Sequence, residues 1–440
     1  MPPATLDGSP YQGYLYAYPH KTAYRPLRPR PALRDIWAGE QRDALFLYLH
    51  VPFCEMRCGF CNLFTRAHPP HEQVAAYLRQ LRHEAAAVVE ALGESRFALG
   101  AIGGGTPTYL TADELATLLS IVDGLGARQA PLSVETSPAT ATPERLAVLA
   151  ERGVHRVSIG VQSFLDTEAH AAGRPQRRSE VERALAAIRD AAVPVLNLDL
   201  IYGIDGQTTA SWDASLRAAL HWRAEEIYLY PLYVRPLTGL GRRADASGER
   251  ASDVDDPAWD QQRLALYRHG RDALRTAGYT QLSMRHFSFA GRAAVTGYDC
   301  QDDGMVGLGC GARSYTRALH YSFDYAVSVR GVRAVLDDYL TRPPEDFARA
   351  EVGFALDDAE QRRRFLVKSL LRAEGASTPD WRERFGDELP ALHELRERGW
   401  LVDEDDRIRL TDEGLARSDA IGPWLVSGPV RAAMRGYEAR

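Results

Sequence analysis

The stretch YLHVPFCEMRCGFCNLF, residues Tyr48–Phe64, carries three cysteines that decide what the chain can be. Cys54, Cys58 and Cys61 follow the spacing Cys-x3-Cys-x2-Cys, directly after the apolar stretch Phe46–Val51. Cysteine is the usual protein ligand of iron–sulfur clusters, and three thiolates on one short loop can bind three irons of a 4Fe–4S cubane. The fourth iron then has no protein ligand, and an open coordination position of this kind favours chemistry on a bound molecule.

Other uses of these cysteines fit the sequence less well. A structural zinc site needs four ligands, usually as two paired half-sites, and no second Cys-x2-Cys occurs, although His50 or His68 could supply a fourth ligand. An electron-transfer cluster would need Cys300 or Cys310, both far away in the sequence. A disulfide framework is not expected in a chain of 440 residues with five cysteines and no secretory signal. We interpret Cys300 and Cys310 as small buried thiols.

Composition sets broad limits on the class of protein. Hydrophobic residues make up 45% of the chain, which is enough for a full core, and the net charge of −6 favours neither nucleic acid nor anionic membranes. No apolar run approaches the roughly 18 residues of a membrane span, and the beginning, MPPATLDGSPYQG, has no signal-peptide core. We therefore expect a protein of the reducing cytoplasm, a compartment that suits an oxygen-sensitive cluster.

Short apolar strand candidates alternate with segments of helical periodicity from Phe46 onward. The strand candidates are Phe46–Val51, Leu99–Ile102, Leu132–Glu135, Arg156–Val161, Val195–Ile201 and Ile227–Tyr230. The helix candidates include Glu72–Leu92, Ala112–Leu125, Pro143–Arg152, Ser179–Ala192 and Ala210–Arg223. This alternation indicates βαβ units and a parallel sheet. It predicts an α/β fold with a partial (β/α)6 TIM-like barrel, in which functional groups lie at the carboxyl ends of the strands.

The character of the chain changes at two places, which predicts three parts. Residues 1–42 form a Tyr/Pro-rich N-terminal strap, and residues 43–356 form the barrel, with the cluster loop at 52–62 and a polar loop or lid at 239–257. Residues 357–440 predict two helices followed by a charged hairpin, a pattern typical of a small winged-helix-like α+β domain. The candidate recognition helix of that domain is not basic, so we expect a cap on the barrel and no nucleic-acid binding.

The strap has two interpretations. Its proline content favours extended segments, and tyrosine buries well while its hydroxyl stays hydrated, so the tyrosines could simply attach the strap to the barrel. Alternatively, the strap closes over the active site and contributes His20 or Tyr24 to substrate contact.

The sequence Gly103-Gly104-Gly105-Thr106-Pro107-Thr108 follows the second strand candidate. Glycines at a strand end let backbone N–H and C=O groups approach a ligand closely. With the cysteine loop, this pattern resembles the radical SAM superfamily, whose cluster binds S-adenosylmethionine (SAM) and cleaves it to a 5′-deoxyadenosyl radical. Further segments resemble one branch of it, oxygen-independent coproporphyrinogen III oxidase and its heme-chaperone relatives. These segments are VETSP, RVSIGVQSF, DLIYGIDGQT, YPLYVRPLTGL, GLGCGARSY and LTDEGL.

The resemblance implies a set of site residues. Cys54, Cys58 and Cys61 are the metal ligands and, with Tyr48, the catalytic residues. The implied cofactor-binding residues are Tyr48, Phe60, Gly104, Gly105, Thr106, Glu135, Gln162, Arg174 and Asp199. Among them, Arg174 could pair with a SAM carboxylate, Asp199 suits a ribose diol, and Glu135 suits either the ribose or the methionine amine.

The resemblance also implies a function and its alternatives. A 4Fe–4S cluster and one SAM, or two, would serve an oxidoreductase that abstracts hydrogen from a small organic substrate, such as a compound of porphyrin biosynthesis, with flavodoxin or ferredoxin as the reducing partner. A heme-binding chaperone and a methyltransferase using a second SAM are the alternatives. The chain departs from the pattern of the oxidases at one place and from that of the chaperones at another. The oxidases usually have a further cysteine two residues after the third ligand, whereas here Asn62 and Leu63 follow Cys61. Residues 298–304 lack the His-Asn-x-x-Tyr-Trp segment of the chaperones.

Overall fold

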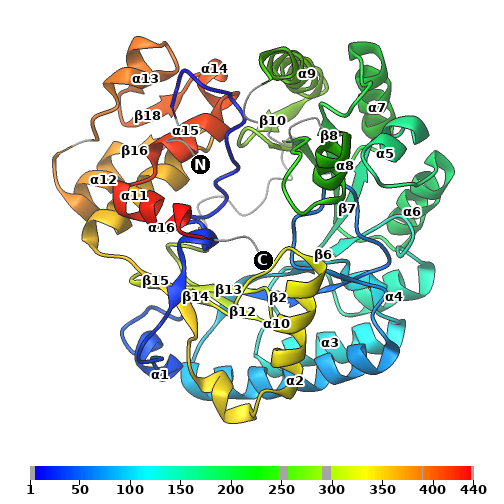
Figure 1. Ribbon diagram of the computed structural model, residues 1–440, viewed down its shortest axis with the longest axis vertical. Helices are drawn as coiled ribbons and strands as arrows, with labels where there is room; N and C mark the ends of the chain where they lie inside the picture. The colour runs from blue at the N-terminus through cyan, green and yellow to red at the C-terminus, as the bar shows by residue number, and fades with distance from the viewer. Residues whose placement is uncertain (1–4, 248–255, 290–298, 389, 438–440) are drawn as a thin grey trace.

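Six parallel strands form the centre of the fold, in the order in which they occur along the chain (Figure 1). The computed structural model describes residues 5–247, 256–289, 299–388 and 390–437. The six strands are β2 (Leu45–Val51), β5 (Phe97–Gly104), β6 (Leu132–Thr136), β7 (Arg156–Gln162), β8 (Val195–Tyr202) and β9 (Glu226–Pro231). Each pairs in parallel with the next, which confirms the predicted α/β fold.

Helices follow each of these strands and cover one face of the sheet (Figure 1). They are α2 (His71–Leu92), α3 (Ala112–Gly124), α4 (Pro143–Glu151), α5 (Asp166–Ala171), α6 (Arg178–Asp190), α7 (Thr209–His221), α8 (Gly239–Ser247) and α9 (Pro257–Thr276). The five predicted helices agree with α2, α3, α4, α6 and α7 within two residues at each end. Capping explains part of this accuracy, since the Thr111 hydroxyl accepts the Glu114 N–H at the start of α3.

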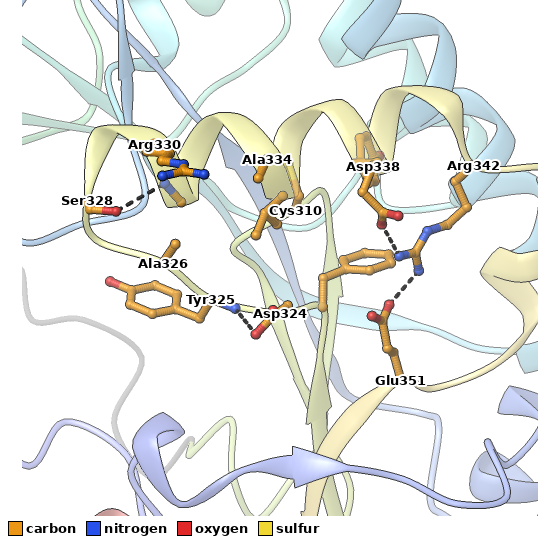
Figure 2. A pocket seen from close by; sticks show the side chains of 14 residues that line it. Cys310, Asp324, Tyr325, Ala326, Ser328, Arg330, Ala334, Asp338, Arg342 and Glu351 are labelled. Atoms are coloured by element: carbon orange, nitrogen blue, oxygen red, sulfur yellow. Dashed lines mark hydrogen bonds and ion pairs between the residues drawn. The ribbon is translucent and has the colours of Figure 1, made fainter. Parts of the chain in front are cut away.

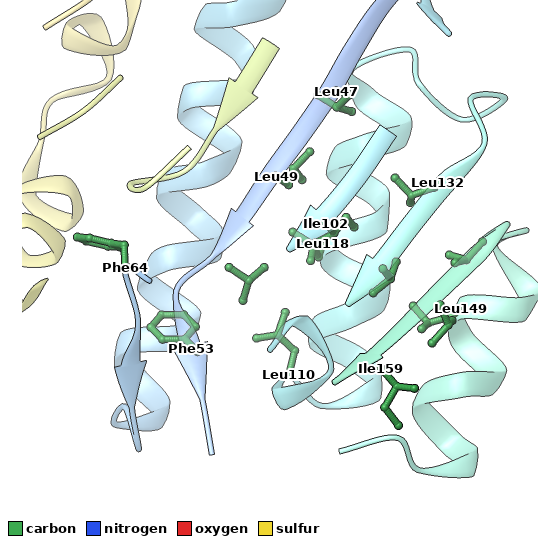
Figure 3. Packing of buried hydrophobic residues seen from close by; sticks show 14 of the residues in the cluster. Leu47, Leu49, Phe53, Phe64, Ile102, Leu110, Leu118, Leu132, Leu149 and Ile159 are labelled. Carbon is green, nitrogen blue, oxygen red and sulfur yellow. The ribbon is translucent and has the colours of Figure 1, made fainter. Parts of the chain in front are cut away.

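The two faces of the sheet differ in chemistry because side chains alternate along each strand. Leu47 and Leu49 point from β2 toward the helices and are fully buried (Figure 3). The alternate positions on the other face are polar or small. Examples are Glu135, Ser158 and Asn197, which are neighbours across β6, β7 and β8. The sheet therefore buries one face under helices and turns the other toward the interior of the partial barrel.

Further strands extend the sheet on both sides. Beyond β9 lie β11 (His286–Phe289) and β10 (Tyr279–Gln281), and beyond β2 lie β12 (Met305–Leu308), β13 (Arg313–Tyr315), β14 (Leu319–Ser322), β15 (Val352–Ala355) and β1 (Arg25–Pro26). Strand β12 runs parallel to β2, and the other added strands pair antiparallel with their neighbours. The order begins at β1 and ends at β10, so the parallel strands form a partial barrel within a longer, open sheet.

The C-terminal region forms a second, smaller α+β unit with a separate hydrophobic core. It contains α11 (Asp358–Leu370), β16 (Ala376–Ser377), α12 (Thr378–Phe385), α13 (His393–Glu397), β17 (Leu401–Glu404), β18 (Arg407–Leu410), α14 (Asp412–Leu415), α15 (Ser418–Leu425) and α16 (Gly428–Arg435). Helices followed by the antiparallel hairpin β17–β18 give the expected winged-helix-like arrangement. The remaining elements are α1 (Leu33–Trp37), α10 (Val329–Thr341), β3 (Phe53–Cys54), β4 (Arg66–Ala67) and the 3-10 turns at Lys21–Ala23, Pro107–Tyr109 and Pro344–Ala348.

The N-terminal strap is packed into both cores (Figure 1, blue). Tyr11 is fully buried in the barrel core, where its ring lies 4.2 Å from the Arg263 guanidinium. Leu15 and Tyr18 belong to the C-terminal core. The domain limits at residues 42 and 357 remain predictions, since the strap shares side-chain packing with the parts on either side of it.

The polar segment 239–257 is only partly what the sequence predicted. Residues 239–247 are helical, so the prediction of a loop was wrong there, while residues 248–255 lie outside the described part of the chain. The Thr238 hydroxyl accepts the N–H of Gly241 at 3.1 Å and starts the helix at its N-terminus. Among the described residues, no helix is long and apolar enough to cross a membrane.

Burial of Tyr11 predicts that the strap contributes to the stability of the whole chain. We expect Tyr11→Ala to lower the free energy of unfolding by about 3 kcal/mol or more, because the substitution empties a closed aromatic site. The matched change Tyr14→Ala, at a side chain that is 42% exposed, should cost less than about 1 kcal/mol. Thermal and urea denaturation of the two variants would test this, and equal shifts would contradict the buried position of Tyr11.

Candidate functional site

The cluster loop begins at the carboxyl end of β2, where β3 carries Cys54. The N–H groups of Gly105 and Thr106 donate to the carbonyls of Val51 and Phe53, each at 2.7 Å. Cys54 is buried, and its Sγ lies 3.4 Å from Thr106 Oγ1. The glycine-rich segment after β5 therefore fixes the start of the loop through backbone bonds, which explains why both motifs follow neighbouring strands.

Gly59, between the second and third cysteines, is clamped by two other loops. Its N–H donates to the Gly173 carbonyl at 2.9 Å, and its carbonyl accepts the Leu240 N–H at 2.7 Å. A Cβ at this position would lie 2.7 Å from the Ala172 carbonyl oxygen. The adjacent Phe60 packs on a small apolar cluster that includes Ala172. Only glycine allows this approach of three backbones.

The far end of the loop is held by the segment before α10. The Arg57 guanidinium donates to the Val327 carbonyl at 2.6 Å, and the Tyr325 hydroxyl donates to the Asn62 carbonyl at 2.8 Å. Arg57 also contacts the carbonyl of Cys61 at 3.4 Å. Backbone carbonyls on both sides of Cys61 are thus tied to elements outside the loop.

The three thiols suit a cluster ligand set. All three cysteines are free, and Cys54 and Cys58 each interact electrostatically with Cys61, so the thiols face a shared region. Burial raises the pKa of the Cys54 and Cys58 thiols, a penalty that binding to iron offsets because iron stabilises the thiolate. Among the described residues no three acidic, histidine or cysteine side chains lie close enough for a single metal ion. A cubane instead spreads its protein ligands over separate irons.

The glycine-rich segment brings a carboxylate to the loop. The Gly104 N–H donates to Glu135 Oε2 at 3.2 Å, and a Cβ on Gly103 would collide with the Glu135 carboxyl at 2.8 Å. Gly104, at φ +109°, also faces the His50 ring, whose Nδ1 lies 3.3 Å from the Tyr48 hydroxyl. His50 Nε2 bonds the Phe64 carbonyl at 2.9 Å, so this histidine has a structural role in the loop.

Glu135 and Asp199 face the interior space from β6 and β8. Glu135 keeps contact with solvent there, yet the surrounding protein, and after it the charge of Asp199, raise its pKa to about 7. Burial also raises the pKa of Asp199, against hydrogen bonds from Asn197 at 2.8 Å and Ser158 at 3.5 Å. Two carboxyls with raised pKa values in one hollow are a feature that accompanies ligand sites.

Gln162 and Arg174 meet over β7. Gln162 has a positive φ of 66° at a bulge in the pairing of β7 with β8. A Cβ on Gly160 would lie 2.6 Å from Gln162 Nε2 and 3.2 Å from Arg174 Nη1. Arg174 also lowers the pKa of the Cys58 thiol against the larger effect of burial. The strained backbone at Gln162 turns its side-chain amide toward the Arg174 guanidinium, close to the cluster loop.

The structure therefore links several of the predicted site residues through direct contacts. Thr106 meets Cys54, Glu135 meets Gly104, and Arg174 connects Gln162 with the Cys58 side of the loop. Phe60 points into the apolar cluster behind the loop. The sequence analysis missed a second polar layer, in which Arg156 bonds Glu226 at 2.7 Å and Tyr228 stacks on His286 at 4.4 Å. The signal was present as polar residues at alternate positions of β7 and β9.

The segment that departs from the chaperone pattern binds the strap. Tyr298 lies outside the described residues, but Gln301 exchanges two hydrogen bonds of 3.1 Å with the backbone of Tyr18. Asp299 pairs with Lys368 at 3.5 Å and with Arg372 at 2.8 Å on α11. This part of the chain joins the barrel to the strap and the C-terminal unit.

A cavity of about 460 Å³ is lined by residues of α10 and of the segment before it (Figure 2). Tyr325 lines it, and the fully buried Cys310 lies at its wall. Arg342 is paired there with Asp338 and with Glu351, the latter at 2.7 Å. The charges in this wall are therefore largely neutralised by one another, and Cys310 is a buried thiol as expected.

Comparison with known proteins identifies the family of this chain. A family model described as the radical SAM superfamily matches residues 48–219. Heme chaperone HemW of Bacillus subtilis is 26% identical over 86% of this chain and 98% of its own length. Oxygen-independent coproporphyrinogen III oxidase of Paracoccus denitrificans is 30% identical over 68% of this chain and 68% of its own.

The fold has a solved counterpart. The structure of coproporphyrinogen III oxidase (HemN) from Escherichia coli, a radical SAM enzyme, superimposes with a TM-score of 0.74 at 22% identity, covering 89% of this chain and 92% of that one. The chain belongs to the radical SAM superfamily, in the branch that includes HemW and oxygen-independent coproporphyrinogen III oxidase, and the cofactors of this family are a 4Fe–4S cluster and SAM.

Proposed function

We propose that the protein is a radical SAM oxidoreductase that abstracts hydrogen from a small organic substrate. The observation that carries this proposal is the loop of three free thiols, held by backbone contacts beside the glycine-rich segment and two perturbed carboxyls. When bound, the 4Fe–4S cluster and SAM supply a 5′-deoxyadenosyl radical by reductive cleavage of the sulfonium. Residues of the chain would bind and position the cluster, SAM and the substrate.

Cys54, Cys58 and Cys61 would hold the cluster and leave one iron open to SAM. The positions of the thiols depend on the clamp at Gly59 and on the contact of Cys54 with Thr106. Such external support keeps a metal site in a fixed geometry.

The neighbouring residues suit the polar groups of SAM. Arg174 offers a guanidinium for the carboxylate, since bidentate pairing is what this group does best. Glu135, with Gly104, Gly105 and Thr106, would receive the methionine amine, and Asp199 would accept hydrogen bonds from the ribose hydroxyls. Gln162, Tyr48 and Phe60 would complete the pocket by hydrogen bonding and packing.

The substrate would lie in the interior space between the sheet and the strap. Aromatic side chains line this region, including Tyr228 and Tyr230, whose rings stack at 5.8 Å. Flat aromatic walls suit a large conjugated or pyrrolic molecule. A porphyrin-like substrate is therefore the class we propose, in agreement with the name of the oxidase relatives.

A heme-binding chaperone is the second candidate. HemW of Bacillus subtilis is matched over 98% of its length, and Leu63 stands at the position, two residues after Cys61, where the oxidases usually have a further cysteine. Methyl transfer with a second SAM is a third outcome of the same chemistry. For any of these, an electron donor such as flavodoxin or ferredoxin could approach Leu63, which is 47% exposed two residues after Cys61.

The products of SAM cleavage distinguish these functions. After anaerobic reconstitution with iron and sulfide, dithionite and SAM should yield 5′-deoxyadenosine, and Cys58→Ala should abolish this product because one iron loses its ligand. Cys300→Ala is the matched control and should retain most of the activity.

Formation of S-adenosylhomocysteine beside deoxyadenosine would indicate methyl transfer. Absence of both products with an intact cluster, together with stoichiometric hemin binding, would overturn the enzyme in favour of the chaperone.

The clamp at Gly59 predicts a specific defect in cluster assembly. Gly59→Ala places a methyl group 2.7 Å from a backbone oxygen, which should displace the loop at a cost of about 1–3 kcal/mol. We expect iron and sulfide per chain after reconstitution to fall clearly below the wild-type values. Gly39→Ala, at a position with nothing within 4 Å, should load normally; equal loading of both variants would refute the clamp.

The raised pKa of Glu135 predicts a pH dependence of SAM binding. With a pKa of about 7, this carboxyl is mostly protonated at about pH 6 and mostly ionised at about pH 8. The ionised form accepts hydrogen bonds from the methionine N–H groups more strongly, because it carries a negative charge. SAM affinity should therefore rise several-fold over this interval.

Equilibrium dialysis of SAM against the reconstituted protein at several pH values would measure this change in affinity. Glu135→Gln should flatten the pH profile while preserving the fold. A variant with the wild-type slope would show that another group titrates.

A further inference from the structure

A small cavity of about 30 Å³ lies where the strap meets the edge of the sheet beyond β12. Its wall includes Lys21 and Tyr24 from the strap, Arg313 from β13, and Tyr325 from the segment that holds the cluster loop. A cavity of this size accommodates roughly one water molecule or one small polar group. The side chains around the cavity determine which kind of group it can bind.

Lys21 contributes an amine that pairs with no carboxylate among the described residues. Its Nζ lies 3.2 Å from the centroid of the Tyr325 ring, and in the described ranges of the chain it makes no ion pair and no side-chain hydrogen bond. Burial, and after it the charge of Arg313, lower the pKa of the Lys21 amine well below its usual value. Among the described residues, no carboxylate forms an ion pair with this ammonium.

Arg313 adds a second positive charge. Its Nε donates to the Tyr315 hydroxyl at 3.0 Å, and its Nη1 donates to the Tyr16 hydroxyl at 2.8 Å. Within the described residues its Nη2 has no hydrogen-bond partner and the guanidinium has no ion pair. Neutral phenols hold this side chain in place and do not neutralise it.

Tyr24 supplies an unused hydroxyl. The residue is 5% exposed, and its hydroxyl is buried with no hydrogen-bond partner in the part of the chain that the structure describes. A buried hydroxyl without a partner is unfavourable and points to a group that the protein binds. The one acidic residue of the wall, Asp324, accepts the N–H of Tyr325 at 2.9 Å and does not contribute to the pKa shift of Lys21.

We propose that Lys21, Arg313 and the Tyr24 hydroxyl form an anion-binding site that receives a carboxylate group of the substrate. The site lies close to the cluster loop, because the ring under Lys21 belongs to Tyr325, whose hydroxyl bonds the carbonyl of Asn62 beside Cys61. A substrate anchored here by one acidic group would have its remaining atoms directed along the cluster side of the interior space. The identification of the anion as part of a substrate rests on the proposed function.

Three features distinguish this site from a surface cluster of basic residues. Its two cations come from segments almost 300 positions apart, it encloses a defined cavity, and it contains a donor that nothing else satisfies. A carboxylate has two acceptor oxygens, so it can bond a guanidinium and a hydroxyl at once and attract the ammonium. A halide ion has a single acceptor centre and bonds fewer of these donors at once.

The chain contains only two lysines, Lys21 and Lys368, which allows a direct test. Reductive ¹³C-methylation of the full reconstituted chain gives one NMR signal for each lysine, assigned by Lys21→Arg and Lys368→Arg. The probes are sodium acetate, its neutral isostere acetamide, and sodium chloride at matched ionic strength. Lys368, already paired with Asp299, is the internal reference.

We expect acetate to shift the Lys21 signal saturably, in the millimolar range, and to leave the Lys368 signal unchanged. Acetamide should have no effect. Arg313→Gln should abolish the shift, and the milder Tyr24→Phe should weaken acetate binding about threefold to tenfold. Arg330→Gln, at an exposed arginine on α10, is the matched control and should bind acetate normally.

Three results would overturn the proposal. The first is the absence of a saturable shift of the Lys21 signal with acetate. The second is a shift in Tyr24→Phe and in Arg313→Gln that equals the wild-type shift. The third is a response to chloride as large as that to acetate, which would mean a site for free inorganic anions. The test does not depend on SAM cleavage. Acetate binding without deoxyadenosine formation would refute the proposed function and leave the anion site in place, whereas the reverse result would refute the anion site alone.

Discussion

The cluster loop has little structure of its own, and its shape depends on close contact between backbones. It contains only two residues of strand between the end of β2 and β4. Three elements hold it through backbone–backbone hydrogen bonds: the glycine-rich segment, the end of α5 and the start of α8. The segment before α10 adds hydrogen bonds made by the side chains of Arg57 and Tyr325. Backbone contacts of this kind are rigid because they do not depend on side-chain rotamers, and rigidity is what a site with three ligands and one open position needs.

The same requirement explains the polar interior. A sheet that packed both faces in apolar cores would leave no space for a cofactor or a substrate, so the inner positions carry charges that must be paired. Arg156 with Glu226, and Arg285 with Asp419, are pairs of this kind. Loss of one partner of a buried pair typically costs about 3–5 kcal/mol. Asp419 also accepts a hydrogen bond from Tyr233, and its carbonyl accepts the N–H of Gly13. One residue of α15 thereby joins the barrel, the strap and the C-terminal unit.

The sequence was most informative where the signal is local. Short apolar runs between segments of helical periodicity located the six strands, and the cysteine spacing located the loop, because both depend on neighbours in the chain. The contact of Arg285 with Asp419 spans 134 positions and has no periodicity that could reveal it. Helix α8 was missed because Gly, Arg, Asp and Ser dominate its composition, while its start depends on Thr238 and on the carbonyl of Gly59. Residues of the site such as Glu135 could be assigned only by resemblance, since no local rule places a carboxyl next to Gly104.

The two interpretations of the strap are not exclusive. Tyr11 is buried in one core and Tyr18 in the other, and β1 pairs with β15 at the edge of the sheet. A lid that opened in each catalytic cycle would have to expose both rings, at a cost of about 2 kcal/mol or more for each side chain. The strap is therefore better described as a fixed wall than as a moving lid. A fixed wall can also carry specificity, because the side chains that it presents to the interior, Lys21 among them, stay in place while substrates are exchanged.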